Sequence, residues 1–351
     1  MELKIGKTFV GTGHPCFIVA EISANHNQSI DKAKKIVKAA KNSGANAIKI
    51  QTYTADSITL NSNKKDFKIP KNSPWSKYKN LWNLYNKAHT SRELHKIIFK
   101  EAKKLDMEYF SSPFDENSVD FLESLNVGAY KIASPEINHI PLIKKVAKTK
   151  KPVILSSGLS NLEDLKLAIN TLKKYNNKKI IVLKCNTSYP SPIKDSNIIT
   201  ISDIKKRFKV LSGLSDHTIE NTSSILSVAL GGSLIEKHIK LDNDINGIDS
   251  FFSLGPKKFS SLVKEIRTAE LALGKISYKI TKSASKNLKG MRSIYVSRKI
   301  KKGEKITQYN VKIIRPSYSL APKHYEKIIG KISIKDLDIG DRISLKKLKD
   351  K

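Results

Sequence analysis

The most regular feature of the chain is a series of short apolar runs, each followed by polar residues and then by a longer connecting stretch. Such runs are typical of buried parallel strands, and the intervals between them are long enough for crossover helices. The pattern predicts eight strand–helix units over about 260 residues, the count and length of a (β/α)₈ TIM barrel. The runs are residues 17–22, 47–51, 107–111, 129–133, 152–156, 180–184, 210–213 and 233–237.

Helical patterns follow several of these runs. Ser29 and Asp31 precede the first of them, as residues that cap helices do. An open doubly wound sheet is the alternative fold, but no glycine-rich dinucleotide turn follows the first run. Helices are predicted at residues 32–42, 116–125, 141–148, 162–175 and 257–273, and the interval 219–232 fits one crossover helix.

Four segments fall outside the repeat. Residues 1–13 alternate apolar and polar positions around two glycines and predict a small hairpin. Residues 52–89 are too long for an ordinary connection, and their aromatic residues predict either a lid facing the substrate or a satellite core. Residues 278–290, rich in Lys and Ser, predict a linker between a barrel domain of residues 1–277 and a small domain of short strands and turns over residues 291–351.

Polar residues follow all eight predicted strands, at the end where barrel active sites form. Helix capping explains Ser156 and Asp115, because Ser and Asp commonly precede the first turn of a helix. It does not explain Lys49, Lys131 and Lys184, because a lysine within a buried strand needs an anionic partner. The pattern therefore predicts an active site at this end of the barrel, with buried lysines facing anions.

Two histidines end neighbouring predicted strands. His217 and His238 each follow an apolar run, and the interval between the two runs fits one crossover helix. Strands joined in this way usually lie side by side, so we expect the imidazoles to meet at the strand ends, together with Asp216, Glu236 and Lys237. Such a group suits a divalent metal that keeps open positions for water or substrate. The alternative is that both histidines make ordinary hydrogen bonds.

Composition narrows the classes of function. Hydrophobic residues make up 39% of the 351 residues, enough for a substantial core, and the formal net charge is +33. The excess lysines are spread along helical stretches such as 31–41 and 144–151, which disfavours a nucleic-acid surface, although a positive field would attract anionic small substrates. The two cysteines form no disulfide framework, and no signal peptide or membrane-spanning run is recognisable. A soluble cytoplasmic protein is predicted.

The strand-end motifs together resemble those of the sialic acid synthase family, in the family's order and over nearly the whole chain. The small domain resembles the antifreeze-like, or SAF, module of that family, through the segments 291–295 and 314–316. The barrel motifs are Glu21-Ile22-Ser23-Ala24-Asn25-His26-Asn27, Lys49-Ile50-Gln51-Thr52-Tyr53, Ser112-Pro113-Phe114-Asp115, Tyr130-Lys131-Ile132-Ala133-Ser134, Leu155-Ser156-Ser157-Gly158, residues 185–190, residues 213–218 and Glu236-Lys237-His238.

Within this family, the segments 23–27 and 50–54 and the predicted lid resemble those of pseudaminic acid synthases. The resemblance implies that phosphoenolpyruvate and water condense with 2,4-diacetamido-2,4,6-trideoxy-L-altrose to give pseudaminic acid and phosphate. Legionaminate and N-acetylneuraminate synthases, which share the mechanism, are the alternatives. One departure lies at Ser91-Arg92-Glu93, where Pro-Trp-Glu is more usual in pseudaminic acid synthases, and it bears on the sugar more than on the chemistry.

The resemblance also implies roles for residues at the strand ends. Glu21 would be the catalytic residue that moves protons, and His217 with His238 would hold Mn²⁺, with Mg²⁺ or Co²⁺ as alternatives. The small domain would cross to the other barrel of a domain-swapped homodimer. The residues expected to bind phosphoenolpyruvate are Lys49, Ser112, Lys131, Ser134, Ser156, Thr187 and Ser215. Those expected to bind the sugar are Gln51, Glu136, Tyr189, Asp249 and, from the other subunit, Arg315.

Two other functions stay open on the sequence. A related barrel aldolase would use Lys131 or Lys184 as a Schiff-base nucleophile. A non-enzymatic carbohydrate- or nucleic-acid-binding protein would use the basic surface and the small domain. The second function gives the paired histidines and the lysines within strands no role.

Overall fold

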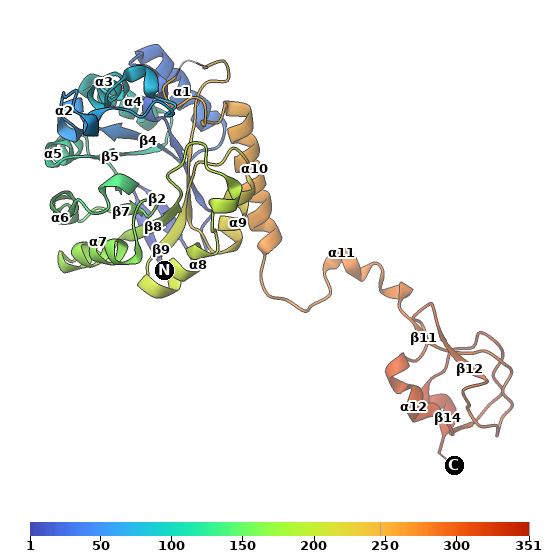
Figure 1. Ribbon diagram of the computed structural model, residues 1–351. Helices are drawn as coiled ribbons and strands as arrows, with labels where there is room; N and C mark the ends of the chain where they lie inside the picture. Colours follow the sequence, from blue (N-terminus) through green and yellow to red (C-terminus); the bar gives the residue numbers. More distant parts are fainter. Residues whose placement is uncertain (246, 351) are drawn as a thin grey trace. The chain divides into compact units, whose positions relative to one another are not determined.

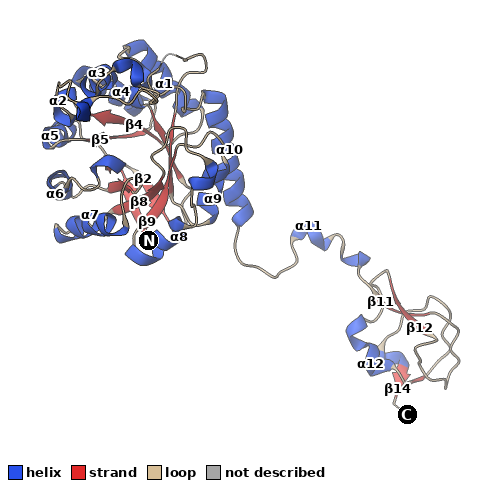
Figure 2. Cartoon of the chain, in the orientation of Figure 1, coloured by secondary structure: helices blue, strands red, loops and turns tan. Residues whose placement is uncertain are grey.

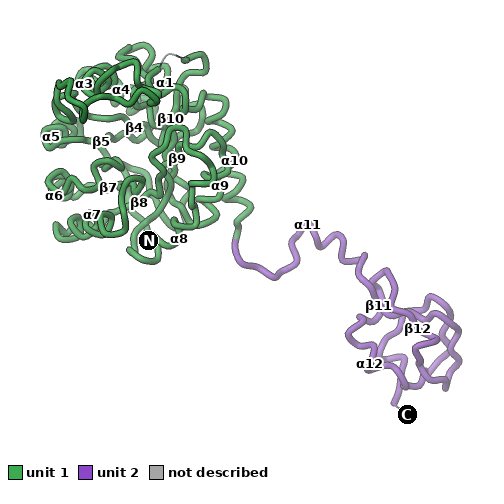
Figure 3. Tube along the Cα trace, in the orientation of Figure 1, with its two compact units in different colours: residues 1–274 green, residues 275–351 purple. Residues whose placement is uncertain are grey.

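The computed structural model describes residues 1–245 and 247–350, and the chain forms two compact units, Met1–Gly274 and Lys275–Lys351 (Figure 3). The first unit contains a closed barrel of eight parallel strands surrounded by helices (Figure 1). The barrel closes because its last strand, β10 (Leu234–His238), pairs with its first, β3 (Phe17–Glu21). This closure confirms the predicted (β/α)₈ barrel and excludes the open doubly wound sheet.

The barrel strands follow the predicted apolar runs, and neighbouring strands are all parallel. β9 (Leu211–Asp216) runs past its expected end at residue 213, because Ser215 still pairs with Cys185 of β8 (Ile180–Cys185). Apolar side chains from the strands and from the inner faces of the helices form one continuous core. The other strands are β4 (Ala47–Thr52), β5 (Glu108–Pro113), β6 (Tyr130–Ile132) and β7 (Val153–Ser156).

Helices cover the outside of the strands (Figure 2). Ser29 caps α1 (Ile30–Asn42) and Asp115 caps α5 (Glu116–Ser124), and each side chain accepts a hydrogen bond from a backbone N–H, at 3.3 and 2.7 Å. No helix within the described residues combines the length and the apolar character that a membrane span requires. The other helices around the barrel are α4 (Arg92–Lys104), α6 (Ile140–Lys148), α7 (Leu162–Lys174), α8 (Thr200–Phe208), α9 (Thr222–Ala229) and α10 (Pro256–Leu273).

A hairpin of β1 (Glu2–Ile5) and β2 (Thr8–Gly11) occupies the predicted N-terminal segment. It is fastened to the amino-terminal end of β5, where Glu108 accepts hydrogen bonds from the Lys7 N–H at 2.8 Å and the Thr8 hydroxyl at 2.9 Å. The hairpin buries apolar side chains in the main core. The strand ends that carry the predicted site lie at the opposite end of the barrel and stay uncovered by it.

The segment predicted as a lid, residues 52–89, includes α2 (Ala55–Ile58) and α3 (Leu81–Ala88). Buried histidines hold both of its ends: His95 bonds Thr52 at 2.8 Å, and His26 bonds Thr90 at 2.9 Å. Burial lowers the pKa of both imidazoles to about 4, so both are neutral near pH 7. The segment has a small apolar core of its own, formed by Ala24, Ile69, Leu84, Ala88 and Ile248 with Trp75, Tyr78, Leu81 and Tyr85 packed against it.

The second unit is a small fold of short strands. β11 (Ser293–Val296) pairs with β12 (Val311–Ile314), and β13 (Ile332–Ser333) pairs with β14 (Leu348–Lys349). The unit also contains two short helices, α11 (Lys282–Ser285) and α12 (Tyr325–Ile328). Every residue of the predicted linker, 278–290, is exposed. Its core is made of Ile294, Val296, Ile300, Ile306, Val311, Ile328, Leu337 and Ile343.

Candidate active site

A cluster of buried charges occupies the carboxyl ends of the barrel strands. Lys49 of β4 forms an ion pair with Glu21 of β3, and its Nζ lies 3.6 Å from Oε1 of Glu236 on β10. Lys131 of β6 places its Nζ 3.7 Å from the same oxygen. All four side chains are almost fully buried, so each charge depends on the others for stabilisation. The structure thus supplies the anionic partners expected for Lys49 and Lys131.

The two carboxylates of this cluster differ in their affinity for protons. Burial raises the pKa of Glu21 to about 7, although Lys49 opposes the shift. Burial also acts against the charged form of Glu236, but Lys131 and Lys49 outweigh it and lower the pKa of that carboxyl. Glu236 is therefore a permanent counter-ion for two lysines, whereas Glu21 can gain and lose a proton near neutral pH.

Hydroxyl groups surround the charges. The Ser112 hydroxyl accepts a hydrogen bond from Lys49 Nζ at 3.3 Å, and the Ser215 hydroxyl donates to Glu236 at 3.1 Å. Ser134 accepts a hydrogen bond from the Leu159 N–H at 2.6 Å. Among the described residues, the buried Ser156 hydroxyl has no hydrogen-bond partner, which leaves it available to a ligand.

The backbone at Gly158 lies close to two hydroxyl groups, those of Thr187 and Ser134. A Cβ atom at this position would lie 2.2 Å from the Thr187 Oγ1 and 2.8 Å from the Ser134 Oγ. Both contacts are too short for a Cβ atom, so any other residue here would force the two hydroxyls to move. The Leu159 N–H next to it donates to Ser134, which follows the strand that carries Lys131, so the group forms a polar recess at the end of β6.

His217 and His238 meet at the strand ends as predicted, with ring centroids 5.3 Å apart. His217 Nδ1 bonds the Asn186 carbonyl at 2.8 Å, which assigns the proton to Nδ1 and leaves Nε2 as an acceptor. His238 Nδ1 is buried and has no hydrogen-bond partner in the described part of the chain. Burial lowers the pKa of His238 well below its usual range, so this imidazole is neutral, as a metal ligand must be.

These two imidazoles fit a divalent ion. Across residues 1–245 and 247–350, no three His, Cys, Asp or Glu side chains gather closely enough to enclose an ion by themselves. The orphaned nitrogen of His238 and the Nε2 of His217, the ring nitrogen that is not turned to Asn186, are therefore the protein's own donors, and water or substrate must complete the coordination. The carbonyl that orients His217 is the kind of outer contact that metal-binding histidines usually have.

Asp216 and Lys237 do not join this group, which corrects the expectation that they converge with the histidines. Successive side chains of a strand point to opposite faces, so when His217 and His238 face the barrel interior, their neighbours face the helices. There Lys237 Nζ forms an ion pair with Asp216 at 2.7 Å, and Ser224 of α9 donates to the same carboxylate at 2.7 Å. The pair ties β9 to β10 directly behind the two imidazoles.

Lys237→Met is expected to lower the free energy of unfolding by about 3–5 kcal/mol, because it leaves the Asp216 charge buried without its partner. Urea denaturation followed by circular dichroism measures this loss. Combining Lys237→Met with Asp216→Asn should recover part of it, because the unpaired charge is then removed as well. An unchanged denaturation midpoint together with lost catalysis would instead place Lys237 in the active site.

A second group of polar side chains lies at the mouth of the barrel, the end at which the carboxyl ends of the strands open. Ser23 donates from Oγ to Asp249 Oδ2 at 2.5 Å and accepts from the Gln51 amide at 3.2 Å. Glu136, after β6, is half-buried, and one carboxylate oxygen has no partner in the described residues. Burial raises the pKa of Glu136 to about 7, against the effect of Lys131. The predicted sugar-binding residues Gln51, Glu136 and Asp249 are thus all accessible at the barrel mouth.

Aromatic side chains cover the mouth. Trp75 of the predicted lid donates from Nε1 to the Ile248 carbonyl at 3.1 Å, and its ring lies 6.0 Å from that of Tyr189. Tyr189 in turn lies 4.5 Å from the His217 ring and 4.8 Å from that of Phe252. The segment therefore carries the predicted satellite core, and its Trp75 packs against residues of the strand-end site. That the segment is a lid facing the substrate stays a prediction.

Lys184, which the sequence also singled out, is not part of this constellation. Lys184 is half-buried and donates to the Cys185 carbonyl at 3.1 Å, and no carboxylate of the described residues lies within ion-pair distance of it. The expectation of an anionic partner is wrong for this lysine, because its position in β8 directs it away from the barrel interior. Arg315 is exposed in the second unit, directly after β12.

The structure also gives residues roles that the sequence did not predict. Glu236 is the shared counter-ion of two lysines, and the two-residue alternation that places His238 inside the barrel could have placed it there too. Tyr53 is buried at the mouth with its ring 5.8 Å from that of Tyr85. Cys185 is buried beside Thr187. Only tertiary contacts reveal these last positions.

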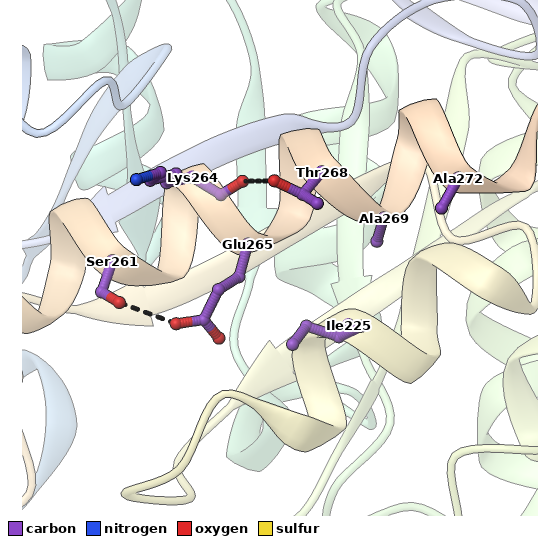
Figure 4. A pocket seen from close by; sticks show the side chains of 7 residues that line it. All are labelled: Ile225, Ser261, Lys264, Glu265, Thr268, Ala269 and Ala272. Atoms are coloured by element: carbon purple, nitrogen blue, oxygen red, sulfur yellow. Dashed lines mark hydrogen bonds between the residues drawn. The ribbon is translucent and has the colours of Figure 1, made fainter. Parts of the chain in front are cut away.

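A groove between α9 and α10 lies on the outer layer and has a volume of about 500 Å³ (Figure 4). Ile225 of α9 faces a row of small and polar side chains on α10, where Ser261 donates to Glu265 at 2.7 Å. The groove is separate from the strand-end site, because its walls are outward-facing helix residues. The lining residues are Ile225, Ser261, Lys264, Glu265, Thr268, Ala269 and Ala272.

A closed eight-stranded barrel with buried lysines, carboxylates and paired histidines at its strand ends defines a (β/α)₈-barrel enzyme. Residues 36–278 match the NeuB family, and residues 291–349 match the SAF domain. The chain belongs to the NeuB family and carries a SAF domain after its barrel. The resemblance to sialic acid synthases that the strand-end motifs carry is thereby confirmed.

Curated relatives and solved structures agree with this assignment. The pseudaminic acid synthase of Campylobacter jejuni is 44% identical over 332 residues, which cover 95% of this chain and 96% of that protein. The N,N'-diacetyllegionaminic acid synthase of the same species is 35% identical, over 91% of this chain and 96% of its own length. The crystal structure of N-acetylneuraminic acid synthetase from Leptospira borgpetersenii in complex with citrate has a TM-score of 0.72 and 28% identity, covering 82% of this chain and 95% of that one.

Proposed function

We propose that this chain is a pseudaminic acid synthase, which condenses phosphoenolpyruvate and water with 2,4-diacetamido-2,4,6-trideoxy-L-altrose and releases phosphate. The observation that carries the proposal is 44% identity to a synthase of that name over 95% of the chain, against 35% for the legionaminic acid synthase. The charges at the barrel mouth support it independently, because phosphoenolpyruvate is a small polyanion and two buried lysines converge there.

Lys49 and Lys131 bind phosphoenolpyruvate together with the surrounding hydroxyls. Their charges are only partly neutralised by Glu21 and Glu236, and Lys131 lies at 3.7 Å from its nearest carboxylate oxygen, which leaves donors for a ligand. The recess at Gly158 offers the hydroxyls of Ser134 and Thr187, from which an anion's oxygens can accept hydrogen bonds. The Leu159 N–H donates to Ser134 and thereby leaves the hydrogen of that hydroxyl for the ligand. The hydroxyl donors proposed for the ligand are Ser112, Ser134, Ser156 and Thr187. Ser215 already donates to Glu236, so we propose that its oxygen only accepts from the ligand or its water.

The reaction needs no reactant other than phosphoenolpyruvate, the sugar and water. C3 of phosphoenolpyruvate attacks the aldehyde carbon of the sugar, whose oxygen takes up a proton, and water adds at C2. The bond between C2 and the phosphate oxygen then breaks, which leaves the keto acid and inorganic phosphate. Glu21 removes the proton from the water that adds at C2, because its raised pKa suits proton transfer near neutral pH. The Ser23 N–H, 2.7 Å from Glu21 Oε1, holds the carboxylate for this step.

The ion site supplies the remaining electrostatic stabilisation. His217 and His238 would hold the ion, with Mn²⁺ preferred and Mg²⁺ or Co²⁺ as substitutes. When bound there, the ion would act as a Lewis acid on the aldehyde oxygen of the sugar. Gln51, Glu136, Tyr189 and Asp249 orient the sugar, and the lid excludes water above it.

A carboxylate that orients the sugar should make sugar binding depend on pH. Because burial raises the pKa of Glu136 to about 7, the group is largely protonated at pH 6 and largely ionised at pH 8. The ionised form accepts hydrogen bonds from sugar hydroxyl or amide groups, so KM for the sugar is expected to fall as pH rises through about 7. Steady-state kinetics from pH 5.5 to 8.5 measure this profile, and Glu136→Gln should remove the inflection. Identical profiles for both proteins would contradict the assignment.

The departure at residues 91–93 does not argue for another sugar. Ser91 caps α4 and accepts a hydrogen bond from the Leu94 N–H at 3.2 Å. Arg92 places its guanidinium 5.1 Å from the centre of the Phe121 ring on α5, in the helix layer. Both side chains thus serve the start of a helix, and neither reaches the mouth of the barrel.

Arg315 acts across a homodimer in this proposal. It stands exposed after β12, outside the barrel, so within the described fold of its own unit it has no role in catalysis. We propose that the small domain of one copy covers the barrel of the other, where Arg315 contacts an acyl or hydroxyl group of the sugar, and that the enzyme is cytoplasmic. Sedimentation equilibrium of the active enzyme is expected to give twice the monomer mass. An active monomer would contradict the swap.

A Schiff-base aldolase is the second candidate, because burial lowers the pKa of Lys131 and so favours the neutral amine. Its position beside Glu236 favours a charged, anion-binding lysine instead. Borohydride reduction in the presence of both substrates separates the two functions. A synthase gains no mass on Lys131, whereas a trapped adduct would show the aldolase.

Phosphate release tests the proposed function. The purified chain with Mn²⁺ and phosphoenolpyruvate is offered the diacetamido-trideoxy altrose, the corresponding mannose of the legionaminic pathway, or N-acetylmannosamine, each alone. Release with the altrose sugar only is the expected result. Phosphate release with only one of the other sugars would overturn the proposed sugar substrate. No release with any of the three sugars would overturn the synthase function.

A further inference from the structure

Ser23 adopts a backbone conformation that serine normally avoids. It follows β3 by two residues, it is buried, and its φ is 47°, in the left-handed region that favours glycine. The surrounding structure must compensate for this conformation, and such residues concentrate at functional sites. A glycine would adopt the same angle without strain, so the serine side chain itself is the feature that needs an explanation.

Three hydrogen bonds of Ser23 join three separate elements. Its N–H donates to Glu21 Oε1 at 2.7 Å, at the end of β3. Its hydroxyl donates to Asp249 Oδ2 at 2.5 Å, in the loop after β10, and accepts from the Gln51 amide at 3.2 Å, in β4. The Ala24 N–H adds a contact to Asp249 at 3.3 Å. One strained residue thus connects the proton-transfer carboxylate with two residues at the accessible mouth.

Asp249 also connects Ser23 to the lid, because residues next to Asp249 contact Trp75. Ile248, the preceding residue, accepts the Trp75 indole N–H at 3.1 Å, and Phe251 lies 5.7 Å from the same indole, centre to centre. Gln51 and Asp249 are half-buried, so part of each side chain can reach a ligand while Ser23 below them is hidden. A change of the Ser23 side chain therefore acts on the groups that face the sugar, whereas the backbone N–H that bonds Glu21, beside Lys49, stays in place.

We propose that Ser23 is a positioning and specificity-determining residue on the sugar side of the site. Its hydroxyl fixes the Asp249 carboxylate and the Gln51 amide in one arrangement, which selects the pattern of hydroxyl and amide groups on the acetamido hexose. At the same time its backbone N–H donates to Glu21. The left-handed backbone conformation allows the N–H and the hydroxyl of one residue to bond these different partners. The inference rests on the proposed synthase function and adds to it the residue that organises sugar recognition.

Two substitutions separate the hydroxyl from the backbone. Ser23→Ala removes the hydroxyl and keeps the strained conformation, whereas Ser23→Gly removes the hydroxyl and relieves the strain. Both keep the N–H that bonds Glu21. Ser29→Ala is the matched control, because Ser29 lies in the same loop but only caps α1. The measurements are KM for the sugar, KM for phosphoenolpyruvate, kcat and the melting temperature.

We expect both Ser23 variants to raise KM for the sugar by about tenfold or more, because a hydrogen bond to a charged group is lost. KM for phosphoenolpyruvate should stay within about twofold, since the lysine cluster is unchanged. Ser23→Gly should melt within about 3 °C of the unsubstituted enzyme, because the strain it relieves offsets the bonds it loses. The relative rates for the altrose, mannose and N-acetylmannosamine substrates should also converge.

Each contrary result has a distinct meaning. If the unsubstituted enzyme releases no phosphate with any sugar, the proposed function fails before the variants are compared. If it turns over and the Ser23 variants keep an unchanged KM for the sugar, the inference about Ser23 is overturned and the synthase function stands. Equal rises in both KM values, together with a lower melting temperature for Ser23→Gly, would show a purely structural residue and also overturn the inference.

Discussion

Replacement of His217 by alanine is expected to reduce kcat at least about a thousandfold and to abolish the binding of Mn²⁺ to the enzyme. The protein offers two imidazole donors, and the described residues contain no cluster of three metal-binding side chains that could compensate for one of them. Loss of a Lewis acid that contributes several kcal/mol to transition-state stabilisation corresponds to a rate loss of this order. The fold should persist, because His217 lies at the strand ends, outside the continuous apolar core, and its Nδ1 bonds the carbonyl of Asn186.

Two measurements check this result independently of turnover. Electron paramagnetic resonance of added Mn²⁺ counts the bound ion, and the melting temperature shows whether the fold survives. His14→Ala is the matched control: His14 bonds Glu2 at 2.6 Å near the N-terminal hairpin, far from the strand ends, so Mn²⁺ binding should stay intact. Full Mn²⁺ binding by the His217→Ala enzyme would show that the ion, if any, is held elsewhere.

Replacement of Glu21 by glutamine is expected to lower kcat by about 10²–10⁴-fold while KM for both substrates changes only a few fold. Glutamine keeps the size of the side chain and can still accept the Ser23 N–H, which lies 2.7 Å from the carboxylate. It cannot take up the proton of the attacking water. Lys49 keeps Glu236 as a counter-ion at 3.6 Å, so the buried ammonium is not left unpaired.

Pre-steady-state and steady-state kinetics distinguish this loss from a binding defect. Glu270→Gln serves as the control, because that carboxyl accepts the Cys16 N–H at 2.5 Å and pairs with Arg267 beside β3's amino end, away from the site. Its kcat should match that of the unsubstituted enzyme. A Glu21→Gln enzyme with nearly full kcat would mean that Glu21 only neutralises Lys49, and that another group transfers the proton.

The position of the active site could be predicted from the sequence because it depends on strand order and direction alone. Parallel strands expose their carboxyl ends at one edge, so polar residues after eight apolar runs had to meet. Lys49, Lys131 and the histidine pair lie at these strand ends, as predicted. Asp216 and Lys237 do not, and the alternation of side chains along a strand already assigns them to the opposite face once the histidines point inward.

Other features depend on tertiary contacts that no sequence pattern contains. The left-handed φ of Ser23 follows from contacts with Glu21, Gln51 and Asp249, which are up to 226 residues away in sequence. The position of the lid also depends on a tertiary contact. Its aromatic residues indicated an apolar cluster, but the hydrogen bond from Trp75 to the Ile248 carbonyl is what fixes the lid over the mouth. Sequence therefore predicts which residues reach the site and much less of how they are oriented within it.

A competition experiment tests which sugar the enzyme uses. The enzyme receives Mn²⁺, phosphoenolpyruvate and equal concentrations of the three candidate sugars, and the products are identified by nuclear magnetic resonance and mass spectrometry while phosphate is counted. We predict one dominant nonulosonic acid, with the configuration of pseudaminic acid, and one phosphate for each molecule formed. A dominant legionaminic or neuraminic acid, or phosphate release without a nine-carbon product, would contradict the account.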